Sequence, residues 1–120
     1  MNEKTCALAG WNLRDGINLV EVGMHNYTKL NLKKGTLEAE LAEDLENAVN
    51  MSITFGTAMI RHEVEELKSK CNMNIDTLKI KNKVEKINQH IKNTELEEAK
   101  DELISIRDEI AFALRGFHGL

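Results

Sequence analysis

Apolar residues recur at helical spacing through the last quarter of the chain. Between positions 93 and 117 they follow one another at alternating steps of three and four, and most residues between them are charged. This pattern predicts an amphipathic helix whose apolar side chains form one narrow seam. The seam must be covered, either by the rest of the chain or by another chain. Its residues are Leu96, Ala99, Leu103, Ile106, Ile110, Ala113 and Phe117.

Two further segments carry a single seam of the same kind. In the first, Gly16 and Gly23 each weaken the predicted helix by ~1 kcal/mol relative to alanine. Residues 16–24 also allow a strand, because Ile17 and Leu19 are two positions apart and would lie on the same face of a strand. The longer helical period favours the helix. The two seams are Leu13, Ile17, Val20, Met24 and Tyr27, and then Ile80, Val84, Ile87 and Ile91.

Positions 37–71 form the longest predicted helix, which spans ~50 Å if it is unbroken. Its apolar residues make two stripes, so we expect neighbours on more than one side and a central place in the fold. β-Branched residues around Gly56 lower the helix propensity, and a break there would divide the segment in two. The first stripe is Leu41, Leu45, Ala48, Ser52, Phe55 and Met59, and the second is Ala42, Val49, Ile53, Gly56, Ile60, Leu67 and Cys71.

Short polar segments separate the predicted helices. Thr36 and Asp76 are the expected N-caps of the second and third helices, because their side chains can accept hydrogen bonds from the first backbone N–H groups. Thr94 and Glu97 have the spacing of a capping box for the fourth helix, and Gly116 is placed to end it. The short connection before that helix requires it to run antiparallel to the third.

Composition agrees with an all-helical fold. The 120 residues suffice for one domain, residues 1–120, with its own core, and the chain contains no proline. Net charges of +2, −5, +3 and −4 for residues 1–35, 36–71, 72–93 and 94–120 favour contact between consecutive helices. We therefore expect an all-α antiparallel bundle of four helices, or of five if the long helix breaks near Gly56.

A homodimer is expected as well, because helices half as long cannot cover the whole ~50 Å helix. Ala48, Ser52 and Gly56 recur every four residues, and such small side chains allow a close crossing within the chain or between two copies. Phe117, near the C-terminus, is a further candidate for contact with a neighbouring subunit. The overall charge of −4 argues against a nucleic-acid partner, and no apolar run reaches the ~18 residues of a membrane span.

The chain has two cysteines, Cys6 and Cys71, which form no CxxC pair and no zinc-type spacing with histidine. The opening residues lack the apolar centre of a secretory signal. We therefore expect two reduced, partly buried thiols in a cytoplasmic protein. A disulfide between the two cysteines is the alternative if the chain is secreted.

Histidine and glutamate pairs are the candidate metal ligands. His62 and Glu66 lie four residues apart on one helical face, within reach of each other or of one metal ion. Glu21 and His25 have the same spacing on the first helix. The two pairs would converge if these helices pack antiparallel. No motif requires a cofactor, but these residues make a divalent metal possible.

Carboxylate pairs at a spacing of three give a second route to a metal. Glu63 with Glu66, and Glu98 with Asp101, could hold Mg²⁺ against a triphosphate if their helices face each other. A complete helix separates the two pairs in the sequence, and acidic helices produce such pairs by chance.

Lys79 and Lys83 share one face of the third helix and are candidates for binding a phosphate-bearing ligand. The alternative is a solvated face paired with the acidic fourth helix.

The sequence contains no constellation typical of nucleophilic catalysis. We therefore expect a non-enzymatic assembly module that binds itself, as a homo-oligomer, and also another protein. A metal-dependent nucleotide hydrolase and a small-ligand binding protein are the alternatives.

Overall fold

The computed structural model describes residues 3–33 and 35–115, and these residues form four helices. They are α1 (Glu3–Lys33), α2 (Ala39–Cys71), α3 (Thr77–Lys92) and α4 (Leu96–Arg115). The prediction of an all-helical fold is confirmed, and the described part of the chain contains no strand. The strand considered for residues 16–24 is therefore wrong, since this segment lies inside α1.

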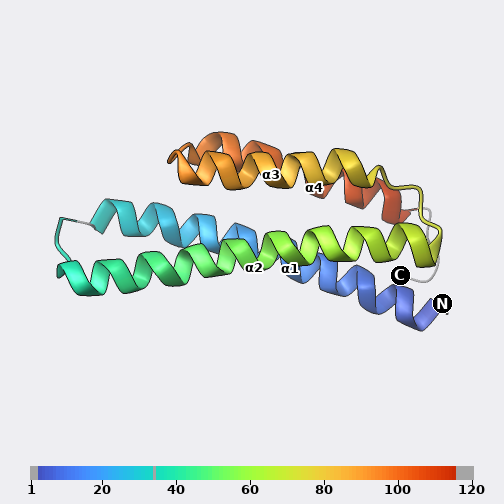
Figure 1. Cartoon of the computed structure of the whole chain (residues 1–120), viewed down its shortest axis with the longest axis horizontal. Helices are drawn as coiled ribbons and strands as arrows, with labels where there is room; N and C mark the ends of the chain where they lie inside the picture. Colours follow the sequence, from blue (N-terminus) through green and yellow to red (C-terminus); the bar gives the residue numbers. More distant parts are fainter. Residues whose placement is uncertain (1–2, 34, 116–120) are drawn as a thin grey trace.

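The helices form two hairpins that lie against each other (Figure 1). The longer hairpin consists of α1 and α2, which run in opposite directions, and the shorter consists of α3 and α4. α2 packs against α1 and α3, while α4 packs against α3 and α1. Figure 1 shows the connection between α1 and α2 extending beyond the end of the shorter hairpin, in a molecule that measures 51 × 24 × 17 Å.

The core consists of the aliphatic seams of all four helices. Branched and straight side chains interdigitate between the two hairpins, as expected for a bundle with few aromatic residues. The largest fully buried side chains include Leu13, Val20 and Met24 of α1, Ile60, Val64 and Leu67 of α2, Ile80, Val84 and Ile87 of α3, and Ile106 of α4.

α2 continues as one helix through Gly56, so the break that would give a fifth helix does not occur. α2 has the expected neighbours on more than one side, since it packs against α1 and α3, but it is not surrounded by all the other helices, because it does not pack against α4. The first of its two apolar stripes is largely exposed: Leu41, Leu45, Ala48 and Phe55 lie at the surface, while Ser52 and Met59 are half-buried beside α1.

Several helix boundaries differ from the sequence prediction. α1 begins well before Leu13, and Thr36 does not cap α2, whose N-cap is Glu38; the Thr36 hydroxyl instead donates to the carbonyl of Lys33 over 2.8 Å. Thr94 has a φ of 60° and donates to the carbonyl of Asn93, so the capping box with Glu97 is not formed. The cap at Asp76 is confirmed. Gly116 lies outside the described residues.

Candidate interaction surface

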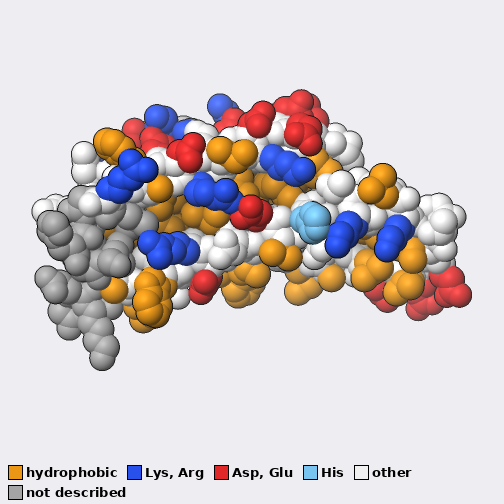
Figure 2. Space-filling view, turned by 180° about the vertical axis from the view of Figure 1, so that it is seen from behind, with side chains coloured by type: hydrophobic (Ala, Val, Ile, Leu, Met, Phe, Trp, Pro, Cys, Tyr) orange, Lys and Arg blue, Asp and Glu red, His pale blue; other side chains and the backbone are white. Residues whose placement is uncertain are grey.

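The face of the α1–α2 hairpin directed away from α3 and α4, here called the outer face, is unusually apolar. A hydrogen bond of 2.9 Å from the Ser52 hydroxyl to the Leu19 carbonyl joins the two helices at this face. Residues at steps of three and four from Ser52 and Leu19 share the face with them. In Figure 2 the outer face lies along the lower edge of the molecule, and hydrophobic side chains gather there. The exposed or half-exposed apolar residues are Leu8, Trp11, Leu19 and Val22 of α1, and Leu41, Leu45, Ala48, Met51, Phe55 and Met59 of α2.

The exposure is largest at the middle of the outer face. Met51 is 71% exposed and Phe55 is 66% exposed, and Trp11 on α1 is 61% exposed. Single exposed apolar residues are ordinary on protein surfaces, but a row of them along two neighbouring helices is typical of interaction surfaces. The first apolar stripe predicted on the long helix supplies most of the α2 part of this row, and Met51 is added to it. The second stripe, with Val49, Ile53 and Ile60, is buried against the rest of the chain.

The molecule as a whole exposes more surface than a compact monomer of its size. Its accessible surface is 7584 Å², whereas a typical monomer of this mass exposes about 6,600 Å². Its radius of gyration is 15.8 Å, against ~13.6 Å for a compact chain of this length. The excess of roughly 1,000 Å² reflects the elongated shape of the molecule, which measures 51 × 24 × 17 Å.

A groove of about 400 Å³ lies between α1 and α2 near their connection. Its floor is apolar, and two lysines, Lys29 and Lys33, lie along its α1 side. The groove continues the outer face toward the end of the hairpin. The remaining lining residues are Asn26, Leu30, Leu37, Leu45, Ala48, Val49 and Ser52.

The predicted row of small residues lies mainly at the crossing of α1 and α2. Gly56 is buried against Gly16, so it is covered within the chain. Ser52 is half-buried and bonded to α1, as described above, while Ala48 is exposed on the outer face. Phe117 lies outside the described residues. The sequence analysis did not single out Met51, Val22 or Trp11 for this surface. Helical spacing gave a signal for them, since Met51 lies three or four residues from members of the first stripe and Val22 lies three residues from Leu19.

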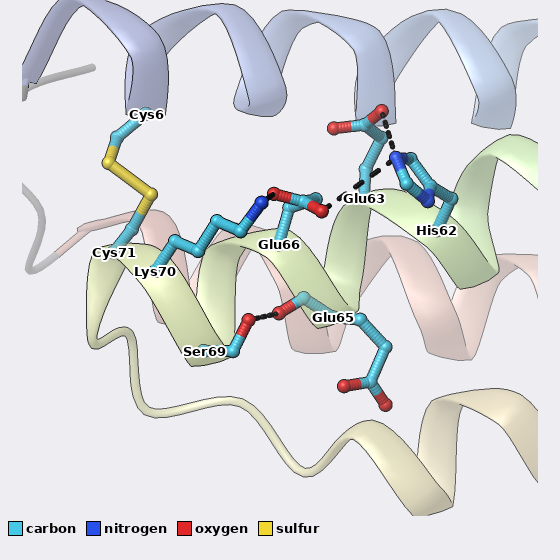
Figure 3. Close-up of polar contacts among 8 residues, drawn as sticks. All are labelled: Cys6, His62, Glu63, Glu65, Glu66, Ser69, Lys70 and Cys71. Atoms are coloured by element: carbon cyan, nitrogen blue, oxygen red, sulfur yellow. Dashed lines mark hydrogen bonds and ion pairs between the residues drawn. A yellow bond between two sulfur atoms is a disulfide. The ribbon is translucent and has the colours of Figure 1, made fainter. Parts of the chain in front are cut away.

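His62 lies at the surface of α2, and its side chain is 68% exposed (Figure 3). Its Nε2 atom is 3.9 Å from a carboxylate oxygen of Glu63 and 3.9 Å from one of Glu66, while Glu66 also pairs with Lys70 at 3.0 Å. Burial raises the pKa of Glu63 above its ordinary value; the charge of His62 opposes this shift and that of Glu66 adds to it. The cluster thus consists of one histidine, two carboxylates and one lysine, all on α2, with an ion pair between Glu66 and Lys70.

The second histidine pair does not join this cluster. Glu21 pairs with Arg107 of α4, with 2.5 Å between the carboxylate oxygen and Nη2. His25 lies beside Glu21 in a groove between α1 and α4. Because Gly16 faces Gly56 and Ile60, Glu21 lies ~14 Å along the hairpin from His62. Among residues 3–33 and 35–115, no three His, Cys, Asp or Glu side chains gather as metal ligands would.

The two carboxylate pairs are also apart. Glu63 and Glu66 belong to α2, whereas Glu98 and Asp101 are exposed on α4. Since α2 and α4 make no contact, the two pairs do not face each other. The geometry for a shared Mg²⁺ ion is therefore not formed by these residues.

Lys79 and Lys83 are paired with the acidic fourth helix. Both contact the carboxylate of Glu109, at 3.0 and 3.3 Å, and the Lys83 ammonium also donates to the hydroxyl of Ser105 over 2.5 Å. Burial alone would raise the pKa of Glu109, but hydrogen bonds from the two lysines and their charges hold it below its ordinary value. The lysine face thus matches the second of the two readings drawn from the sequence, an ion-paired surface.

The two cysteines are bonded in the structure, so the expectation of reduced thiols is wrong here. The disulfide joins Cys6, near the start of α1, to Cys71, the last residue of α2, and their Cα atoms are 5.9 Å apart (Figure 3). The antiparallel course of α1 and α2 brings these distant positions together at one end of the hairpin. The half-buried Cys71 is thereby covered by the first turns of α1.

None of the four described helices is both long enough and apolar enough to cross a bilayer. No protein family, curated protein or solved structure that we compared with this chain gives a match.

Proposed function

We propose that this protein is a non-enzymatic assembly module that associates with a second copy of itself through the outer face of the α1–α2 hairpin. The observation that carries the proposal is the row of exposed apolar side chains along both helices. The row is not explained by the fold, because the core is complete without it. Another protein with an apolar helical face is a further partner that the same surface would accept.

The size of the outer face supports a stable contact. α2 is ~50 Å long and packed helices lie ~8–10 Å apart, so the face of the hairpin covers on the order of 1,000 Å². This exceeds the ~800 Å² per partner of a standard interface. Removing apolar surface from water gains roughly 25 cal/mol per Å², which must offset the entropy lost on association.

The alternatives have less support from the geometry. A metal-dependent nucleotide hydrolase would need the candidate ligands to converge, and Glu66 and Glu21 are instead engaged with Lys70 and Arg107. A small-ligand site at Lys79 and Lys83 would have to compete with their ion pairs to Glu109.

The cytoplasmic location expected from the sequence loses one of its arguments. It depended partly on reduced cysteines, and a lasting disulfide is rare where cellular reductants keep thiols reduced. Counting free thiols in protein purified without reductant tests this point directly.

The mass in solution tests the proposal. Sedimentation at micromolar concentration should give twice the chain mass of 13.6 kDa for the wild type. Met51→Glu with Phe55→Glu should give the monomer mass with an unchanged helical spectrum, since both side chains are exposed and point out of the core. Leu78→Glu is the matched control, because Leu78 is 68% exposed but lies on α3. A monomeric wild type, or a double variant that remains dimeric, would refute the proposal.

A further inference from the structure

We infer that the two copies meet with the connected ends of their α1–α2 hairpins side by side, so that α1 of each copy lies along α2 of the other. This arrangement rests on the proposed function, since it specifies how the outer faces pair. The charges at the connected end of the hairpin carry the inference.

The outer face has opposite charges on its two helices at this end. Lys29 and Lys33 lie along the α1 side of the groove. On α2, Glu40 and Asp44 are exposed one helical turn apart, close in sequence to Leu41 and Leu45 of the apolar row. Among the residues that the structure describes, none of these four charged side chains has an ion-pair partner.

Helix electrostatics explain why the charges separate in this way. The C-terminus of α1 favours cations and the N-terminus of α2 favours anions, because the peptide dipoles align along each helix. The connected end of the hairpin is therefore positive along one helix and negative along the other. A surface of this kind is complementary to a copy of itself only in some orientations.

A two-fold axis can relate two stacked hairpins in two ways. If the axis runs along the helices, α1 faces α2 of the second copy and both connected ends lie together. Lys29 and Lys33 then face Glu40 and Asp44 of the second copy, and symmetry repeats the contact. The groove lies along this axis, so its apolar floor is covered by the same region of the second copy.

If the axis runs across the helices, each helix faces its own copy and the connected ends lie apart. Asp44 then lies opposite the far half of α2, where Glu63 and Glu66 share the surface with one lysine. The lysines of α1 then lie opposite the first half of α1 of the second copy, where Leu8 is exposed. Lys29 and Lys33 no longer face Glu40 and Asp44, so these complementary contacts are lost and electrostatics favour the first arrangement.

Charge reversal with mixing tests the arrangement. One variant carries Lys29→Glu and Lys33→Glu, and the other carries Glu40→Lys and Asp44→Lys. In the inferred arrangement each variant alone has two repulsive contacts, so we expect its dimer dissociation constant to rise at least tenfold at low salt. An equimolar mixture restores attraction in both contacts, and we expect a heterodimer with close to wild-type affinity.

The control is Lys86→Glu, an equally exposed reversal on α3, which should leave the dimer unchanged. A dimeric wild type whose mixed variants fail to restore affinity would overturn the inferred arrangement while the proposed assembly stands. The same holds if each reversal alone is harmless. A monomeric wild type would instead remove the proposed function, and the inference with it. Circular dichroism of each variant confirms that the helices persist.

Discussion

The carbonyl oxygen of Gly16 on α1 occupies the place next to Gly56 where a side chain on α2 would begin. A Cβ atom added to Gly56 would lie 2.7 Å from that oxygen and 2.7 Å from a methyl carbon of Val20. The contact is reciprocal, because a Cβ atom on Gly16 would lie 2.9 Å from the Cβ of Met59. The pair of glycines therefore sets how closely the two long helices approach.

We expect Gly56→Ala to destabilise the protein. Overpacking against backbone atoms costs ~1–3 kcal/mol, and the better helix propensity of alanine returns up to ~1 kcal/mol. The expected net loss in the free energy of unfolding is about 1–2 kcal/mol. Urea denaturation followed by circular dichroism measures it.

Gly35→Ala serves as the control for this substitution. A Cβ atom at position 35 would meet nothing within 4 Å, so alanine there should cause no loss. Equal stability of the Gly56 variant and the wild type would show that α1 and α2 do not cross as closely as described.

The disulfide should make the stability of the protein depend on reductant. The bonded cysteines are 65 residues apart in the sequence, and closing a loop of this size removes roughly 4 kcal/mol of chain entropy from the unfolded state in the simplest model. Reducing the wild type should lower its urea midpoint accordingly. Cys6→Ala should show a low midpoint that reductant does not change. Identical curves for the oxidised and reduced wild type would contradict the bond.

The helical seams were predictable because they depend on local spacing alone. Ile80, Val84 and Ile87 are buried as predicted, since any helix at this position must place them on one face. Caps were less predictable: Asp76 caps α3, but Thr94 adopts a positive φ and turns its hydroxyl to the carbonyl of Asn93. Whether a threonine caps the next helix depends on the path of the loop, which the sequence pattern does not specify.

The exposed apolar outer face was predictable only in part. The two apolar stripes of the long helix were visible, but spacing cannot say which stripe the rest of the chain covers. Gly16 was read as a weak point of α1, and its pairing with Gly56 is a contact between positions far apart in the sequence. The disulfide was misjudged for the same reason, because Cys6 and Cys71 meet only through the antiparallel packing.

His62 should be dispensable for folding and for metal content. Among the residues that the structure describes, its close carboxylates are those of Glu63 and Glu66, each 3.9 Å from Nε2. Surface substitutions of this kind usually change stability by less than ~0.5 kcal/mol. We expect His62→Ala to melt with the wild type, and neither protein to retain zinc in stoichiometric amount after dialysis. Zinc bound one to one by the wild type and lost in the variant would contradict this reading.

Glu109 should contribute to the loss of stability in acid. Its pKa lies below the ordinary value of 4.5 because the hydrogen bonds and charges of Lys79 and Lys83 outweigh the effect of burial. A carboxyl group whose pKa is lowered by folding stabilises the native state fully above its unfolded pKa, and the contribution disappears as the pH falls through the folded pKa. The relevant range is thus below about pH 5, around and under the ordinary glutamate pKa.

Glu109→Gln isolates this contribution. Because these ion pairs lie near the surface, the variant should be less stable than the wild type by about 1 kcal/mol or less at pH 7. The difference should shrink toward acid pH as Glu109 of the wild type becomes protonated. Glu102→Gln on the same helix is the control, since its carboxylate makes no ion pair among the described residues. Urea midpoints measured from pH 3 to 7 give both curves, and a difference that stays constant over this range would show that the lysines do not hold Glu109 ionised.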